Sequence, residues 1–343
     1  MIHVNSAIFS PRFSDRWNIT SAQWASARAG IASLVYPSGV VATGVDSSIP
    51  NFATYPLPLG CSHMTQYAIA NPGGRVCTEP QYQYLCYPTA SAVGKTFVWL
   101  CGHLAPNQYI QTDGSSPIVQ MLALGWHVLI IPIPTLDWTA VAPGPQHITI
   151  NGILTSVFEH AYQPLDHDGG PNANRMFTDQ AIRATTQAIA DVSPSKLILA
   201  GHSGGGNTSA MVAALDSRFV AYYCFEGGLS YALGAGLGSV TDYEQAITAN
   251  TIYGASTPTA QDVWGMFRIG AAVKGRRNGI ASAISDEYFP ITNQPLWREQ
   301  TECMSDMLRS AGATVTAFTE ASMHTMTAAR VSWMLADIAA NGF

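Results

Sequence analysis

The chain has 343 residues and is poor in charge, because Asp, Glu, Lys and Arg make up only 11% of it, against about 25% in average soluble domains. Its apolar share of 47% and its formal net charge of −6 exclude the low-hydrophobicity, high-charge pattern of disordered chains. No basic stripe is present, and no apolar run comes near the about 18 residues that a membrane span requires. We therefore expect a soluble globular protein that binds no nucleic acid and has no membrane span.

Residues 1–90 are rich in Ser, Thr, Pro, Gly and Tyr, with short strand-like runs at 39–43 and 82–87. We expect a β-rich or irregular extension that packs on the core. The first residues contain no basic segment followed by an apolar stretch, so no signal peptide is expected here. The compartment stays open between secreted, phage- or cell-surface-associated and cytoplasmic.

The six cysteines give no single redox pattern. Cys101 and Cys224 lie in apolar runs and are expected to be free and buried. Cys61, Cys77 and Cys86 cluster near the N-terminus, and one disulfide among these three is left open.

A second, larger domain is expected over 91–343, where short apolar runs alternate with helical patterns. Strands are expected at 96–101, 128–131, 196–200, 219–225, 280–284 and 314–318, and helices at 177–192, 208–215, 302–311 and 325–340. Unbroken apolar runs are typical of strands buried on both faces, so this pattern predicts an α/β fold with a mostly parallel central sheet flanked by helices. The long stretches 135–175 and 227–278 interrupt the rhythm, and we interpret them as lid-like or substrate-binding insertions.

The segment Gly-His-Ser-Gly-Gly at 201–205 fits the pattern G-x-S-x-G, with an apolar strand before it and a helix of small residues after it. In this context Ser203 sits on a sharp strand-to-helix turn that exposes its hydroxyl at the carboxyl end of the sheet. Side chains in place of the flanking glycines would clash with the neighbouring strand and helix. The N-terminus of the helix favours negative charge at the same point, so we predict that Ser203 is a nucleophile.

At residues 196–206 the sequence resembles the nucleophile region of the α/β-hydrolase superfamily, in particular serine esterases of its dienelactone-hydrolase and acetyl-esterase-like branch. The resemblance extends as a pattern over about residues 90–343. It implies an α/β-hydrolase fold, a catalytic domain over 91–343 and a triad in the chain order Ser, acid, His. His324 is the only histidine after Ser203 and precedes the last expected helix, so it is the predicted general base.

The acid is assigned from the same resemblance. Asp286 follows the strand expected at 280–284 and begins a D-x-x-x-P turn similar to that after the penultimate strand of many superfamily members, so it is the predicted acid. Glu226, at the end of the preceding strand, is the alternative acid, and Glu287 and Asp262 are weaker candidates. On this assignment Asp286→Asn should abolish most activity and Glu226→Gln should not.

An oxyanion hole needs backbone N–H groups aimed at the developing charge. One is expected from Gly204, directly after the nucleophile. The other is expected from the loop after the strand 96–101, where Gly-His stands in place of the His-Gly of many superfamily members. Leu104 or His103 is the expected second donor, and the choice between them stays open.

A metal alternative depends on a loop with Glu159, His160 and the run Asp-His-Asp at 166–168, with His147 nearby. The spacing fits neither an EF-hand nor a H-E-x-x-H motif, so we expect no metal and no other cofactor. Several aromatic residues of the two insertions are candidates for a substrate platform: Trp138, Tyr162, Tyr231, Tyr243, Trp264 and Phe267. The basic pair at 276–277 is expected on the solvated surface.

The sequence thus predicts a serine hydrolase that works through an acyl-enzyme, and the resemblance implies that it cleaves carboxylic esters. Its expected substrate is a small-molecule or carbohydrate ester, in particular a short-chain or acetyl ester. A peptidase or amidase of the same fold is one alternative. A non-catalytic binding module on a hydrolase scaffold is another, because a fold does not determine a function. The oligomeric state stays open.

Overall fold

The fold is given by a computed structural model that describes Tyr36 and residues 43–52, 57–74, 77, 79–104, 106–134, 147–150, 153–156, 174–227, 275–283, 305, 309 and 313–343. The strands are β1 (Ser47–Ile49), β2 (Cys61–Ile69), β3 (Gln81–Pro88), β4 (Lys95–Leu100), β5 (His127–Ile131), β6 (His147–Ile150), β7 (Ile153–Ser156), β8 (Lys196–His202), β9 (Ala221–Phe225), β10 (Arg277–Ala283) and β11 (Thr314–Glu320). The helices are α3 (Pro117–Ala123), α5 (Asn174–Val192), α6 (Gly204–Leu215) and α11 (Ala328–Ala340), with short 3-10 turns η1 (Pro72–Gly74) and η2 (Pro106–Tyr109).

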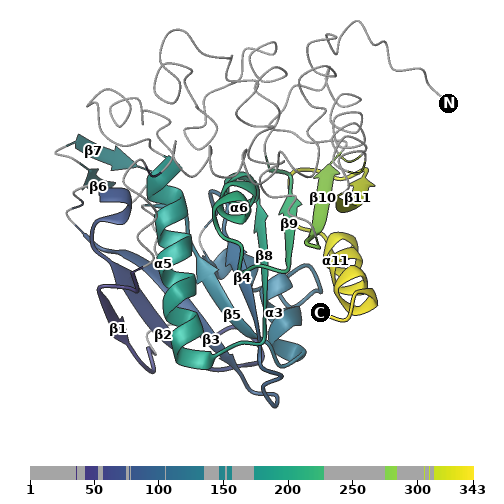
Figure 1. The fold of residues 1–343 in the computed structure, drawn as a ribbon, viewed down its shortest axis with the longest axis horizontal. Helices are drawn as coiled ribbons and strands as arrows, with labels where there is room; N and C mark the ends of the chain where they lie inside the picture. The colour runs from purple at the N-terminus through teal and green to yellow at the C-terminus, as the bar shows by residue number, and fades with distance from the viewer. Residues whose placement is uncertain are drawn as a thin grey trace, which may run out of the picture.

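Nine of these strands form one sheet in the spatial order β1-β2-β3-β5-β4-β8-β9-β10-β11, and β6 pairs with β7 in a separate hairpin (Figure 1). The pairs from β1 to β5 are antiparallel, whereas every pair from β5 to β11 is parallel. This arrangement confirms the predicted α/β class with a mostly parallel central sheet.

Helices cover both faces of the sheet (Figure 1). Along the central strands, buried side chains alternate between the cores on the two faces. In β4, Val98 and Leu100 belong to the core formed with α5 and α6, whereas Phe97 and Trp99 belong to the core formed with α3 and α11. Burial on both sides explains why the strand reads as an unbroken apolar run. The carboxyl ends of the parallel strands lie at one edge of this sandwich, where open α/β sheets bind ligands.

Side-chain caps define the starts of two of these helices. The Oγ of Ser116 accepts a hydrogen bond from the Val119 N–H at 3.1 Å at the start of α3. The Oγ of Thr327 accepts one from the Arg330 N–H at 3.2 Å at the start of α11. The second cap fixes where the last helix begins, directly after the loop that contains His324.

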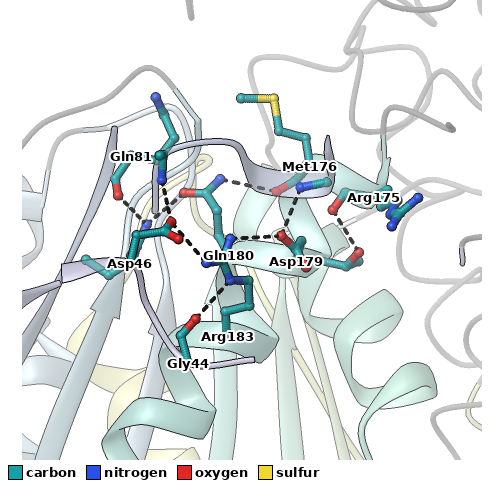
Figure 2. Close-up of polar contacts among 12 residues, drawn as sticks. Gly44, Asp46, Gln81, Arg175, Met176, Asp179, Gln180 and Arg183 are labelled. Carbon is teal, nitrogen blue, oxygen red and sulfur yellow. Dashed lines mark hydrogen bonds and ion pairs between the residues drawn. The ribbon is translucent and has the colours of Figure 1, made fainter. Parts of the chain in front are cut away.

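The strands before residue 90 belong to the same sheet as the rest of the chain, because β3 pairs with β5. Polar contacts on α5 also hold the segment that leads into β1 (Figure 2). Arg183 pairs with Asp46 at 3.0 Å and donates to the Gly44 carbonyl at 3.0 Å. Asp179 accepts a hydrogen bond from the Gly73 N–H at 2.9 Å. The predicted division into 1–90 and 91–343 stays a prediction.

Several expected elements fall mostly outside the described residues: the strand at 39–43, the helix at 302–311, and the insertions 135–175 and 227–278, including all six aromatic candidates. Five described strands and helices were not expected, namely β1, β2, β6, β7 and α3. All five lie before Ser203 in the chain: β1 and β2 at one edge of the sheet, β6 and β7 in the separate hairpin, and α3 on the face opposite α5.

The expectation of a solvated basic pair is wrong for Arg276, which is 3% exposed. Its guanidinium donates to the carbonyls of Phe219 at 3.0 Å and Asp216 at 2.7 Å, and also to that of Ala213. These carbonyls lie at and just beyond the end of α6, so the side chain satisfies acceptors that the helix itself leaves free.

None of the described cysteines, which are Cys61, Cys77, Cys86, Cys101 and Cys224, forms a disulfide. Cys101 and Cys224 are buried, as predicted. Among the helices of the described residues, none combines the length and the apolar character needed to cross a membrane.

Candidate active site

Ser203 lies at the turn between β8 and α6, where the G-x-S-x-G pattern predicts it. Its backbone has φ 57° and ψ −126°, a combination that L-residues rarely adopt and that costs about 1–3 kcal/mol. Its N–H donates to the carbonyl of Phe225 at the end of β9, at 2.9 Å. Such a strained serine at a strand-to-helix turn is typical of a nucleophile, because the turn exposes the hydroxyl.

The glycines around Ser203 are required by close approach of the backbone. A Cβ on Gly201 would overlap the carbonyl oxygen of Gly205, and a Cβ on Gly205 would overlap those of Leu100 and Cys101. The turn therefore packs directly against the end of β4, which is the physical reason anticipated for the glycines of the motif.

His324 lies in the loop between β11 and α11, with 9% of its side chain exposed. Its ring centroid is 5.1 Å from that of His202, the residue immediately before Ser203. The structure thus brings the predicted base to the end of β8 that carries the predicted nucleophile.

The carboxylate next to His324 belongs to Glu226, which directly follows β9. Its Oε2 lies 3.5 Å from Nδ1 of His324. Its backbone also has a positive φ, of 51°, and its N–H donates to the Ala281 carbonyl at 2.9 Å. Asp286, the predicted acid, lies outside the described residues, so its position relative to His324 stays a prediction.

Glu226 is held as an anion although it is 2% exposed. Burial alone would raise the pKa of its carboxyl group, but a hydrogen bond from His202 and the electrostatic effects of His202, His324 and Arg330 outweigh burial and lower the pKa below its ordinary value. An anion at this place can stabilise positive charge that develops on the His324 ring.

A fully buried arginine, Arg330 in the first turn of α11, balances this charge. Its guanidinium forms an ion pair with Oε1 of Glu226. It also donates to Ser322 Oγ at 2.6 Å and to the Thr325 carbonyl. Because these two residues flank His324, one cation holds both the Glu226 carboxylate and the loop that carries the predicted base.

The backbone around Gly102 limits which groups can form the oxyanion hole. The Gly102 N–H donates to the Tyr109 hydroxyl at 2.9 Å, so it is committed within the protein. The following N–H groups, those of His103 and Leu104, remain the predicted second donors, and Gly204 at the start of α6 remains the predicted first.

His202, Glu226 and His324 have donor atoms within 4.8 Å of one another, the spacing of a candidate cation site among the described residues. Two observations favour a hydrogen-bonded cluster instead. Glu226 Oε2 lies only 2.7 Å from His202 Nε2, whereas two ligands around tetrahedral zinc, with bonds of about 2.0–2.1 Å, lie roughly 3.3 Å apart. Arg330 already supplies a cation to the carboxylate. The side chains of the loop weighed as a metal alternative, at 159–168, and of His147 lie outside the described ones.

Comparison with known proteins identifies the fold. No protein-family model matches the sequence, and neither does any curated protein. Among solved structures, the acetyl xylan esterase of Paenibacillus sp. R4 matches with a TM-score of 0.52 and 16% identity, over 94% of this chain and 94% of that one. Acetyl xylan esterase 1 of Thermoanaerobacterium sp. JW/SL YS485 matches with a TM-score of 0.51 and 13% identity, over 94% and 95%. The chain has the α/β-hydrolase fold.

An acylaminoacyl peptidase of Pyrococcus horikoshii shares the α/β-hydrolase fold with a TM-score of 0.50 and 10% identity. That match covers 76% of this chain but only 40% of the peptidase. Esterases and a peptidase thus both occur among the structures that this chain resembles.

Three residues of the site were not singled out in the sequence: His202, Tyr109 and Arg330. Tyr109 contacts His202, and both His202 and Arg330 contact Glu226. The two residues of each pair lie far apart in the sequence, so no local sequence pattern links them. The sequence offers one indication of His202, which is its place at the variable position directly before the serine of G-x-S-x-G.

Proposed function

We propose that the protein is a serine hydrolase that cleaves carboxylic esters through an acyl-enzyme. The observation that carries the proposal is the strained turn at Ser203 beside the His324–Glu226 pair. A binding module would have no need of a strained serine, an adjacent imidazole and a buried carboxylate together.

In the proposed reaction, His324 takes the proton of the Ser203 hydroxyl as its oxygen attacks the ester carbonyl carbon. Glu226 stabilises the resulting imidazolium. The oxyanion is bound by the N–H of Gly204 and by that of His103 or Leu104. His324 then gives the proton to the departing alcohol, and a water molecule, activated by the same base, hydrolyses the acyl-enzyme.

Glu226 is the acid that we propose, since its carboxylate lies 3.5 Å from His324 Nδ1 and its pKa is held low. Asp286 is the alternative from the sequence. The two place the acid after different strands, β9 and β10, so replacing each in turn separates them.

For the substrate we propose a short-chain ester, in particular an acetyl ester of a carbohydrate. The acetyl xylan esterases with the same fold support this choice, and they match over nearly their whole length. The acylaminoacyl peptidase with the same fold is the reason to test an amide as well.

The test is hydrolysis of p-nitrophenyl acetate by the wild type and by Ser203→Ala. Loss of activity in the variant, together with labelling of the wild type alone by a fluorophosphonate, is the expected result. Equal rates in both proteins would overturn the proposal. Acetylated xylan and an N-acetyl-amino-acid anilide, assayed in parallel, then decide between ester and amide cleavage.

A further inference from the structure

His202 is buried, with 2% exposure, and both of its ring nitrogens have partners. Nδ1 lies 3.2 Å from the Tyr109 hydroxyl oxygen, and Nε2 lies 2.7 Å from Glu226 Oε2. The strongest hydrogen bond of Glu226 Oε2 by distance is therefore to His202, because the same oxygen is 3.5 Å from His324 Nδ1.

The donor and acceptor of each hydrogen bond in the series Gly102–Tyr109–His202–Glu226 follow from the first bond. The Gly102 N–H donates to the Tyr109 hydroxyl oxygen, so the hydroxyl proton is free to go to His202 Nδ1. Nδ1 then accepts, and the ring proton resides on Nε2, where it is donated to Glu226. Burial lowers the pKa of His202, which fits a neutral ring with one acceptor and one donor nitrogen.

We infer that His202, fixed in this tautomer by Tyr109, is a positioning residue that aims Glu226 at His324. The inference rests on the proposed function, in which Glu226 serves the base. It assigns a function to His202, the variable residue before the serine of the G-x-S-x-G motif. It also links the acid to Gly102, which directly precedes the predicted oxyanion donors, so two halves of the site share one hydrogen-bonded chain.

Among the described residues, the charged and titratable groups that face Glu226 come from a strand, a loop and a helix. They are His202 from β8, His324 from the loop after β11, and Arg330 from α11, whose Nε lies 3.4 Å from Glu320 Oε2. In the described part of the chain, Cys101 is a further titratable group near Tyr109, and burial raises the pKa of its thiol and keeps it neutral.

Removing the His202 N–H takes away a donor that stabilises the Glu226 anion and leaves the other charges in place. The Glu226–His324 pair then binds a proton more readily, so the acidic limb of the activity profile moves to higher pH. A hydrogen bond to a charged group corresponds to a shift of about one pH unit.

The experiment compares four proteins: the wild type, His202→Phe, His202→Gln and Tyr109→Phe. The measurement is kcat and KM for p-nitrophenyl acetate between about pH 5 and pH 9, per active site titrated with fluorophosphonate. We expect His202→Phe to shift the acidic limb upward by about one unit and to lower kcat by about 10- to 100-fold with little change in KM. His202→Gln, whose amide retains a donor, should have its acidic limb at nearly the same pH as the wild type. The acidic limb of Tyr109→Phe should lie between those of His202→Gln and His202→Phe.

Tyr67→Phe is the matched control. It also removes a buried hydroxyl, which donates to Asp191 at 2.5 Å, but on the α5 side of the sheet. It should leave the pH profile unchanged.

The inference would be overturned if the acidic limb of the pH profile of His202→Phe stayed unshifted and kcat per titrated site stayed unchanged, so that the variant merely contained fewer active sites. That result would leave the proposed function intact. Activity in Ser203→Ala would instead overturn the proposed function, whatever the His202 variants do.

Discussion

Ser203 and Glu226 occupy equivalent places on neighbouring parallel strands. His202 and Phe225 are register partners at the ends of β8 and β9, so Ser203 and Glu226 are the first residues after the two strands. Both have a positive φ, of 57° and 51°. The register of the two strands thus brings the serine turn and the buried carboxylate to the same point of the sheet edge, and strain at both is typical of a functional site.

Glu226→Gln should lower kcat for p-nitrophenyl acetate by about 10²- to 10⁴-fold, because a neutral amide cannot stabilise an imidazolium on His324. Asp286→Asn is the matched comparison and should retain most of the activity. The reverse result would assign the acid to Asp286, as the sequence alone predicted.

Arg330→Met should lower the free energy of unfolding by about 3–5 kcal/mol, because it leaves the buried Glu226 carboxylate without its cation. Urea denaturation near neutral pH measures this loss. Arg277→Met is the control, since Arg277 pairs with Asp337 but is 20% exposed, and it should cost about 1 kcal/mol. Equal losses in the two variants would contradict the assigned role of Arg330.

The stability of the protein should fall as the pH drops below about 6.5, because burial lowers the pKa of His202 beneath that ordinary value. The unfolded chain takes up this proton first, so stability rises with pH, by at most about 1.4 kcal/mol per pH unit for one such histidine. His127, whose pKa burial also lowers, adds to the same slope. Urea midpoints at about pH 7.5 and pH 5.5 should lie closer together in His202→Gln than in the wild type, and an unchanged gap would refute this account.

Gly205→Ala should abolish activity and most soluble protein, because its Cβ would overlap the carbonyl oxygens of Leu100 and Cys101. Gly44→Ala is the control. The nearest atom to its Cβ is the side-chain oxygen of Gln187, 2.7 Å away, at the free end of a flexible side chain that can move. Thermal unfolding should therefore change by only a few degrees in the control, roughly in line with ΔΔG below 1 kcal/mol.

The strand-to-helix turn at Ser203 and the parallel strands were predictable because their signals are local. β4, β8 and β9 are buried on both faces and appear as unbroken apolar runs. β2 was missed since its buried positions include Thr65 and Gln66, and α3 because it has only seven residues.

The electrostatic part of the site was not predictable in the same way. Which carboxylate lies next to His324 depends on how the ends of β9 and β10 and the loop after β11 are arranged in space. The D-x-x-x-P pattern concerns only the segment after β10. Arg276 and Arg330 look like surface residues by type, yet both are buried, because each satisfies acceptors contributed by segments distant in the chain. No window of neighbouring residues contains that information.

On the proposed assignment, Ser203, Glu226 and His324 are all synthesised before Arg330, the residue that pairs with Glu226 and holds the loop of His324. A nascent chain that ends in the loop after β11 already contains the serine, the carboxylate and the histidine, but α11 with Arg330 follows them. Because domains assemble as their segments emerge, such a chain has a buried acid with no counter-ion and a base on an untethered loop. We therefore expect hydrolytic competence to require the docking of α11, and a fragment truncated before α11 to be inert although it contains every proposed reacting group.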